Sequence, residues 1–341
     1  MPHQQYFPAL RHLAPLAAAS LLALLGACGG GTGQDPADTA QASEASDGTA
    51  AATAFVRRTA STSNTLQVGL ALPGFPHKFD VYRPAGATRA VVFLHGLGGR
   101  SFQMARDLGL NSVMAPPTMN TVNWDWLTRN GIIAVFPQAT TPAGSTLPTW
   151  SDYVQSSGQD DVGFLKALSA SLKAQYGATE VSLSGHSNGG AMTARMWCEA
   201  TTAYKAFVTL AAPMPSSSFP SPAATCTPLV PAPYHAVVGG QDTKLAQFFQ
   251  AAQPPSAEQM AAGLSSPTLA YEWSRHYDRS FRVCSEWPAL AARSTANAGP
   301  GWSQCGGRVR YTVVSKADHP IASLEQYAGQ RMADLIAAFV K

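Results

Sequence analysis

Short, nearly continuous apolar segments recur along the chain from about residue 64 onward. Six of them are rich in β-branched residues and span 90–94, 132–136, 181–183, 207–210, 235–238 and 309–314. Because such segments are apolar on both faces, each predicts a strand buried in a parallel sheet that helices cover on both sides. Two earlier segments, 66–72 and 79–82, predict a leading antiparallel pair of strands.

Helical spacing of apolar residues falls between these segments. One helix is predicted to begin at Asp160 and Asp161, which suit an N-terminal cap, and to end at Gly177. Pro320 is predicted to be the first residue of a C-terminal helix. The apolar side of that helix carries Ile321, Leu324, Met332, Leu335, Ile336 and Phe339. Strands that alternate with helices predict an α/β fold with a doubly wound, mostly parallel sheet.

The stretch from about 243 to 307 departs from this alternation. It is rich in Ala, Pro, Ser and Gly and contains one helix-like piece at 269–277. An insertion there is expected to project over the carboxyl ends of the strands, where α/β enzymes bind ligands. A lid-like substrate-binding wall and an excursion that only stabilises the fold both remain open.

Composition favours a globular protein with a large core. The 341 residues are 45% hydrophobic and 13% charged, with a formal net charge of +3. Disorder and coiled coils are disfavoured by this balance. No run of basic residues stands out, so nucleic acid is not an expected partner.

The first 28 residues are interpreted as a targeting segment. Arg11 precedes an apolar stretch at 13–27 that is too short to span a bilayer comfortably. The stretch ends in Leu-Gly-Ala-Cys28, which resembles the lipobox of bacterial lipoproteins and implies lipidation of Cys28. A lipid anchor there predicts a membrane partner and a cell-envelope location. The outer membrane is favoured because Gly29 replaces the aspartate that marks inner-membrane retention. Ordinary secretion is the alternative.

Residues 29–63 are dominated by small and polar residues and predict a disordered tether, which leaves 64–341 as the folded domain. Four cysteines follow the tether: Cys198, Cys226, Cys284 and Cys305. In an oxidising compartment an even number predicts two disulfides with three pairings open. Cys198–Cys226 and Cys284–Cys305 are favoured because they close short loops. No cysteine or histidine cluster has metal-ligand spacing, so no metal is expected.

The sequence Gly185-His186-Ser187-Asn188-Gly189 has the form G-x-S-x-G. It lies directly after a predicted strand and directly before a helix-like run at 191–198, which is the context that a nucleophile elbow requires. Ser187 is therefore the candidate nucleophile. A plain glycine-rich turn is the alternative that this context disfavours.

A nucleophilic serine needs a base and an acid. His319 is the histidine that follows the last predicted strand, where the base of this fold belongs. Asp242 follows the strand at 235–238 and is expected to orient the imidazole. Asp318 adjoins His319 and is a rival acid. Backbone N–H groups of Leu97, in the loop after the first core strand, and of Asn188 are the expected oxyanion donors.

Taken together, four segments resemble the polyhydroxybutyrate depolymerase and feruloyl-esterase-like family of α/β-hydrolases. They are 94–99 (LHGLGG), 150–152 (WSD), 160–165 (DDVGFL) and 185–192 (GHSNGGAM), and with Asp242 and His319 the likeness covers about residues 78–320. The resemblance implies the α/β-hydrolase fold and ester hydrolysis through an acyl-enzyme without a cofactor. The stretch from about 243 to 307 is then expected to form a lid-like insertion before the catalytic histidine.

The substrate is expected to be an ester or a polyester, such as a hydroxyalkanoate. Trp150, His186 and Trp302 are substrate-binding candidates, and Trp287 is a further tryptophan that a groove would use. Two alternatives remain: a feruloyl or acetyl esterase acting on plant polysaccharide, and a surface lipoprotein that keeps the fold without catalysis. The complete set of Ser187, Asp242 and His319 argues against the second alternative.

Overall fold

The computed structural model describes residues 61–152, 155–212, 232–248, 290–291 and 301–341. All of them belong to a compact unit that spans Ala54–Lys341. The targeting segment, Cys28 and nearly all of the tether lie outside the described residues, as do Cys226, Cys284, Trp287 and the helix-like piece at 269–277. The predictions made for those residues, including both disulfide pairings, therefore stay predictions.

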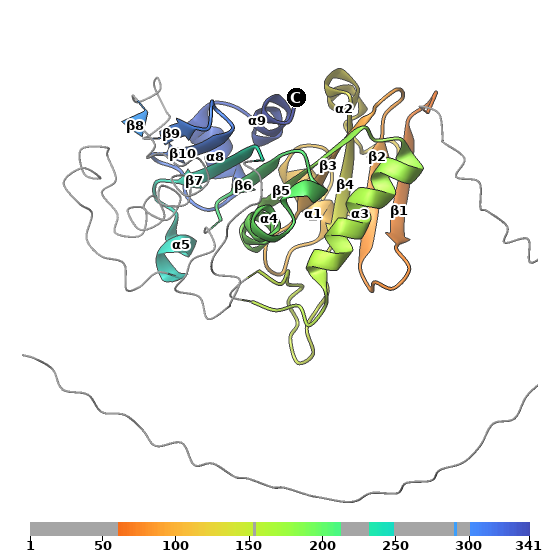
Figure 1. The fold of residues 1–341 in the computed structure, drawn as a ribbon, viewed down its shortest axis with the longest axis horizontal. Helices are drawn as coiled ribbons and strands as arrows, with labels where there is room; N and C mark the ends of the chain where they lie inside the picture. The colour runs from red at the N-terminus through yellow and green to blue at the C-terminus, as the bar shows by residue number, and fades with distance from the viewer. Residues whose placement is uncertain (1–60, 153–154, 213–231, 249–289, 292–300) are drawn as a thin grey trace, which may run out of the picture. The chain divides into compact units, whose positions relative to one another are not determined.

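One sheet of ten strands organises the described part of the chain (Figure 1). Its spatial order is β1-β2-β4-β3-β5-β6-β7-β10-β9-β8. The strands are β1 (Thr65–Ala71), β2 (Lys78–Arg83), β3 (Arg89–Leu94), β4 (Ile132–Gln138), β5 (Glu180–His186), β6 (Phe207–Leu210), β7 (Tyr234–Gly239), β8 (Leu290–Ala291), β9 (Gly301–Gln304) and β10 (Val309–Val314). The six strands from β4 to β10 along this order are parallel, which confirms the central prediction. The antiparallel pairing of β1 with β2 is confirmed as well.

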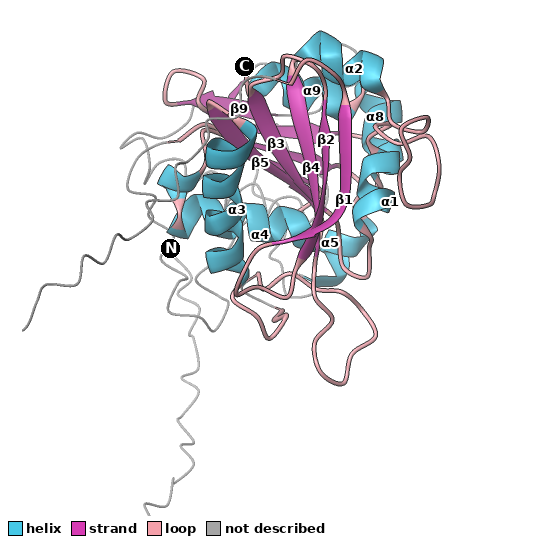
Figure 2. Ribbon diagram, turned by 90° about the vertical axis from the view of Figure 1, so that its right-hand side faces the viewer, coloured by secondary structure: helices cyan, strands magenta, loops and turns pink. Residues whose placement is uncertain are grey.

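Helices cover both faces of the sheet (Figure 2). On one face lie α3 (Asp161–Tyr176) and α4 (Asn188–Glu199), followed by the short 3-10 turn η1 (Thr201–Ala203). On the other lie α1 (Ser101–Asp107), α2 (Trp124–Asn130), α8 (Ile321–Ala328) and α9 (Met332–Phe339). The strands in between bury side chains in two separate apolar clusters, one under each helix layer. Burial on both faces explains why these strands are continuous apolar runs in the sequence.

The caps of α3 match their prediction. The Asp160 carboxylate accepts a hydrogen bond from the Gly163 N–H at 2.8 Å, which satisfies one of the free N–H groups of the first turn. Gly177 ends the helix in the left-handed region with φ of 66°. Glycine adopts that conformation without the steric cost that a side chain brings.

The prediction of a single C-terminal helix is wrong. The structure has two helices there, α8 and α9, where a single one was predicted. Gly329 follows α8 with φ of 67°, and the chain restarts after the extended residue Arg331. Pro320 is the extended N-cap of α8 rather than its first helical residue. The apolar spacing continues across Gly329 because α8 and α9 contribute to the same buried cluster.

The segment predicted as an insertion begins with α5 (Thr243–Phe248) and adds the antiparallel strands β8 and β9 to the edge of the sheet. Sequence patterns missed these elements and also α1 and α2. Among the described residues, no helix has the length and hydropathy needed to cross a membrane.

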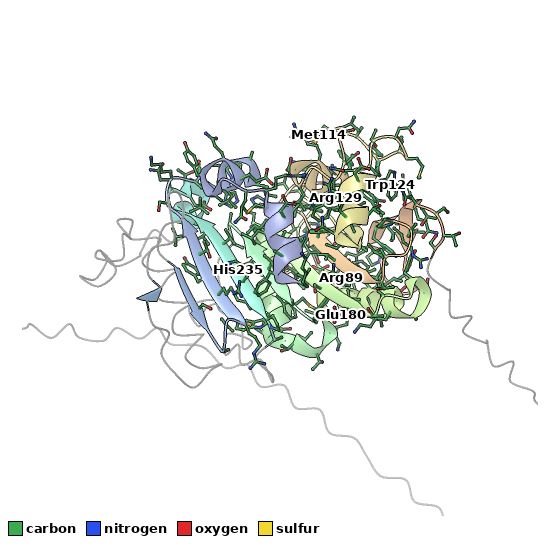
Figure 3. The ribbon with its side chains drawn as sticks, turned by 90° about the horizontal axis from the view of Figure 1, so that it is seen from above. Arg89, Met114, Trp124, Arg129, Glu180 and His235 are labelled. Atoms are coloured by element: carbon green, nitrogen blue, oxygen red, sulfur yellow. The ribbon has the colours of Figure 1, made fainter. Side chains whose placement is uncertain are left out.

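The two ends of the parallel strands have different roles. Arg89 and Glu180 are register partners at the amino ends of β3 and β5 and are labelled in Figure 3. The opposite, carboxyl ends of β3 and β5 lead into the loop of His95 and into Ser187. The candidate chemistry therefore gathers at the carboxyl edge, as expected for an α/β sheet. With this strand order and the G-x-S-x-G turn between β5 and α4, the chain has the α/β-hydrolase fold.

Candidate active site

Ser187 occupies a sharp turn between β5 and α4. Its dihedrals are φ 55° and ψ −123°, a strained conformation for a residue with a side chain. The Ser187 N–H donates to the Leu210 carbonyl of β6 at 2.9 Å, which fixes the turn to the sheet. A methyl group on Gly185 would strike the backbone of Gly189, and one on Gly189 would strike carbonyl oxygens of the β3 end. Only glycine lets these segments approach so closely.

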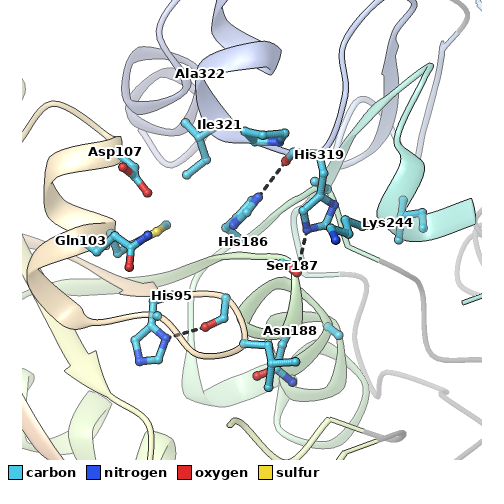
Figure 4. Close-up of a pocket in the computed structure, with 18 of the residues that line it drawn as sticks. His95, Gln103, Asp107, His186, Ser187, Asn188, Lys244, His319, Ile321 and Ala322 are labelled. Atoms are coloured by element: carbon cyan, nitrogen blue, oxygen red, sulfur yellow. Dashed lines mark hydrogen bonds between the residues drawn. The ribbon is translucent and has the colours of Figure 1, made fainter. Parts of the chain in front are cut away.

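His319 lies in the loop between β10 and α8, within reach of the serine. Its Nε2 is 2.8 Å from Ser187 Oγ, as the dashed line in Figure 4 shows. Its Nδ1 is 3.0 and 2.9 Å from the two carboxylate oxygens of Asp242. A proton on Nδ1 donates to the carboxylate and leaves Nε2 to accept the serine O–H. The structure thus brings the three predicted residues into one hydrogen-bonded chain.

Asp242 is nearly buried, with 5% of its surface exposed. Its Oδ1 also accepts the N–H groups of Lys244 and Leu245 at 3.0 and 2.9 Å, so the carboxylate caps α5. The rival, Asp318, instead accepts the N–H groups of Thr243 and His319 at 2.9 and 2.8 Å. The Thr243 N–H is the largest cause that lowers the Asp318 pKa. Asp318 holds the two loops together, and Asp242 is the carboxylate that meets the imidazole.

The neighbouring strands β7 and β10 explain this meeting. Their parallel register pairs Gly239 with Val314, so the loops that follow leave the sheet at the same height. The Gly240 N–H donates to the Val314 carbonyl at 2.8 Å, and the Gln241 N–H donates to the Ala317 carbonyl at 2.8 Å. Residues far apart in sequence are thereby placed side by side.

The loop after β3 is held by His95, which is 2% exposed. Its Nδ1–H donates to the Gly96 carbonyl at 2.7 Å, and its Nε2 accepts the Ala139 N–H at 3.1 Å. Burial, and then the nearby charge of Arg100, lowers the pKa of His95 to about 4. The imidazole is therefore neutral at pH 7, which is the form that both hydrogen bonds require.

The two predicted oxyanion donors border the same cavity as Ser187. Asn188 is the first residue of α4, where a backbone N–H has no partner within the helix. Leu97 lies in the loop after β3 with 42% of its surface exposed. This loop lies against Ser187, because a Cβ on Gly96 would be 3.2 Å from Ser187 Cβ.

The cavity has a volume of about 940 Å³ and is shown in Figure 4. Apolar side chains on its wall include Leu97, Met104, Leu245 and Ile321. Polar side chains that sequence reasoning missed as pocket residues are Gln103, Asp107, Asp152, Gln155 and Lys244. The WSD segment at 150–152 resembles a family motif, but nothing in the sequence indicates that Asp152 lines the cavity or that α1 forms part of its wall.

His186, a predicted substrate-binding residue, lines the cavity. Its Nε2–H donates to the His319 carbonyl at 2.9 Å, and the two imidazole rings are 5.0 Å apart. Burial is the main cause that lowers the pKa of His186 to about 4, and the neighbouring His319 ring adds to it. His186 is thus a neutral side chain that also supports the backbone of His319.

The prediction that Trp150 forms the wall of a substrate groove is corrected by its burial. Its side chain is 0% exposed and lies in the cluster under α3 and α4. A side chain without exposed area supports the site from beneath and does not present a surface to substrate. The backbone of Trp302 lies in β9, opposite Tyr311, but its side chain is not described, so its predicted role stays a prediction. Within the described segments, no group of three or more His, Cys, Asp or Glu could hold a metal ion.

Comparison with known proteins adds a general likeness. No family model matches the chain, and a search of curated proteins finds no match. Among solved structures, acetyl xylan esterase from Aspergillus awamori is 15% identical with a TM-score of 0.48, over 78% of this chain and 99% of that one. An esterase from Pyrococcus furiosus is 14% identical with a TM-score of 0.45, over 82% and 92%. A hyperthermophilic esterase from Pyrobaculum calidifontis is 13% identical with a TM-score of 0.46, over 82% of each chain. At these values no reaction or substrate is carried over from these proteins.

Proposed function

We propose that the protein is a serine hydrolase of carboxylic esters. The observation that carries the proposal is the hydrogen-bonded chain from Ser187 Oγ through His319 to Asp242. It starts at a strained elbow that lifts the serine hydroxyl into a cavity. Backbone strain costs free energy and is found mainly at functional sites, so its presence together with this chain of hydrogen bonds favours a catalytic role over a plain turn.

In the proposed reaction Ser187 Oγ attacks the ester carbonyl while its proton passes to His319 Nε2. The negative charge that develops on the carbonyl oxygen is met by the N–H groups of Leu97 and Asn188. The intermediate collapses when the alcohol leaves with the proton from Nε2, and an acyl-enzyme remains on Oγ. Water, deprotonated by His319, then attacks the acyl-enzyme and releases the acid. Asp242 stabilises the imidazolium in both halves of the reaction.

For the substrate we propose a hydroxyalkanoate ester, as in a polyhydroxybutyrate depolymerase-like enzyme. The cavity is of a size that suits a small ester or the end of a polyester chain. Its wall combines apolar side chains with Gln103 and Gln155, which are able to bind a hydroxyl or a second ester group. A feruloyl or acetyl esterase acting on polysaccharide is the second candidate, since the same polar residues also suit a sugar.

The test compares purified wild type with Ser187→Ala on p-nitrophenyl butyrate, a hydroxybutyrate oligomer and methyl ferulate. Loss of the nucleophile is expected to lower kcat by about 10⁶-fold, to the level that binding and the oxyanion donors supply. Preference for the oligomer supports the hydroxyalkanoate substrate, and preference for methyl ferulate favours the second candidate. A folded wild type that is inactive on all three esters would contradict the hydrolase proposal and favour a non-catalytic lipoprotein.

We also propose that the protein is exported and lipidated at Cys28. The lipobox-like sequence and the small-residue tether that follows support this location. Expression of Cys28→Ser beside wild type, with a radioactive fatty acid, is expected to give label and membrane fractionation only for wild type. Equal labelling of both proteins would contradict lipidation at this residue.

A further inference from the structure

Trp150 makes hydrogen bonds with both segments that border the reacting serine. Residue 150 lies in neither a helix nor a strand, and its backbone N–H donates to Asn188 Oδ1 at 2.8 Å. Its carbonyl accepts Asn188 Nδ2–H at 2.9 Å. The side-chain amide of Asn188 is thus paired with one backbone unit, and a third bond at 2.8 Å joins its Nδ2 to Asp152 Oδ2.

The indole of Trp150 reaches the other segment. Its Nε1–H donates to the His95 carbonyl at 3.1 Å, within the loop that carries Leu97. The next carbonyl along, that of Gly96, accepts both the His95 Nδ1–H and the Gly99 N–H, at 2.7 and 3.0 Å. In a trans peptide the C=O and the following N–H point in opposite directions. Fixing the Gly96 carbonyl therefore also fixes the direction of the Leu97 N–H.

Trp150 is itself held rigidly. Its ring is parallel to the His77 ring within 4°, with centroids 5.9 Å apart. The next residue, Ser151, donates its N–H to Asp161 Oδ2 at 2.6 Å, and Asp161 Oδ1 lies 2.6 Å from His77 Nε2. The Ser151 carbonyl accepts Arg195 Nη1–H of α4 at 2.7 Å.

We propose that Trp150 is a positioning residue that couples the two oxyanion donors, the N–H groups of Leu97 and Asn188, to one another. The inference rests on the proposed serine hydrolase function. Because the donors come from separate segments, their separation has to match the developing oxyanion and not the ground-state carbonyl. One buried residue bonded to both segments sets that separation and prevents either donor from moving alone.

Trp150→Phe is the sharpest test, since it keeps an aromatic ring in the core and removes the indole N–H together with the part of the ring that carries it. Trp197→Phe is a matched control. Trp197 is also 0% exposed, and its Nε1–H donates at the same 3.1 Å to a backbone carbonyl, that of Ala232. Both substitutions delete one buried indole hydrogen bond, but only the first bond leads to the oxyanion loop.

The readout is kcat and KM on an ester and on the matching thionoester, in which sulfur replaces the carbonyl oxygen. Sulfur accepts hydrogen bonds weakly, so the preference for the oxygen ester reports on the alignment of the donors. Trp150→Phe is expected to lower kcat on the oxygen ester by about 10- to 100-fold, less than the loss of a whole donor, with KM almost unchanged. The ester-to-thionoester ratio is expected to fall by a similar factor. Trp197→Phe is expected to leave both quantities near wild type.

Asn188→Ala provides a second variant if Trp150→Phe does not fold, because it keeps the backbone N–H and removes the amide bonds to Trp150. It is expected to reduce the same ratio, and the double variant is expected to lose less than the product of the two single effects. Equal behaviour of Trp150→Phe and Trp197→Phe, or an unchanged ratio in Asn188→Ala, overturns the coupling. Ser187→Ala in the same series separates the two claims: full activity in that variant refutes the hydrolase itself.

Discussion

Replacing Asp242 by Asn tests which carboxylate assists His319. In the proposed reaction the imidazole becomes positively charged during attack, with Asp242 Oδ2 at 2.9 Å from Nδ1. Charge centres roughly 4 Å apart interact by about 4 kcal/mol at an effective dielectric constant of about 20. That energy corresponds to about 10³-fold in rate, and an amide that favours the wrong tautomer raises the expected loss in kcat towards 10⁴-fold.

The same substitution is expected to preserve the fold. An Asn side chain accepts the N–H groups of Lys244 and Leu245 as the present carboxylate does, and Asn is as good a helix cap as Asp. Thermal unfolding is therefore expected to change little while kcat collapses. The assay is hydrolysis of p-nitrophenyl butyrate at neutral pH, with circular dichroism on the same samples.

Asp318→Asn is the matched control. Its carboxylate binds backbone N–H groups and not the imidazole, so kcat is expected to stay within about tenfold of wild type. The reasoning is refuted if Asp318→Asn loses the larger part of the activity while Asp242→Asn keeps it. Asp318 would then be the residue that stabilises the imidazolium.

Two further predictions concern pH and the elbow. Burial is the main cause that lowers the pKa of His95 and His186 from 6.5 to about 4, and that of His235 from 6.5 to about 3. Between about pH 4 and 6.5 the unfolded chain therefore binds more protons than the folded one, and stability is expected to fall as the pH drops through this range, with about 3 kcal/mol of that loss from His95. Urea unfolding at pH 7.5 and 4.5 checks this, and equal stability at both would contradict it. Gly189→Ala places a methyl group against the carbonyl oxygens at the end of β3. We therefore expect it to lower the free energy of unfolding by about 1–3 kcal/mol and to remove most of the activity. A Gly189→Ala variant with the melting temperature and kcat of wild type would show that the elbow tolerates the side chain.

The sheet was predictable because its central strands are buried on both faces, which leaves short runs such as 207–210 that match β6 residue for residue. The segment 309–314 also matches β10 residue for residue, although Arg310 within it is exposed. The order Ser, Asp, His at strand ends was readable for a similar reason, since each residue follows a recognisable strand. A helix end that is marked by one glycine could be predicted only where the apolar pattern of the sequence also stopped. At Gly177 it does, whereas at Gly329 the pattern continues and two helices were read as one.

The rest of the site depends on contacts between distant segments. Spacing does not show that Asp318 turns to backbone N–H groups while Asp242 faces the imidazole. Nor does it show that the Trp150 backbone pairs with an amide 38 residues away. A tryptophan near a catalytic motif looks the same in sequence whether it faces substrate or lies beneath the site. Burial decides between these roles, and burial is a property of the folded chain.

Covalent trapping of the nucleophile tests the central claim most directly. Incubation of the purified protein with a p-nitrophenyl phosphonate ester, followed by peptide mass spectrometry, locates any serine whose hydroxyl is activated by a base. The account predicts one phosphonyl group per chain, on Ser187, with activity lost in proportion to labelling and no label in His319→Ala over the same time. Labelling of another residue, or full inhibition with Ser187 unmodified, would contradict the assignment of Ser187 as the nucleophile.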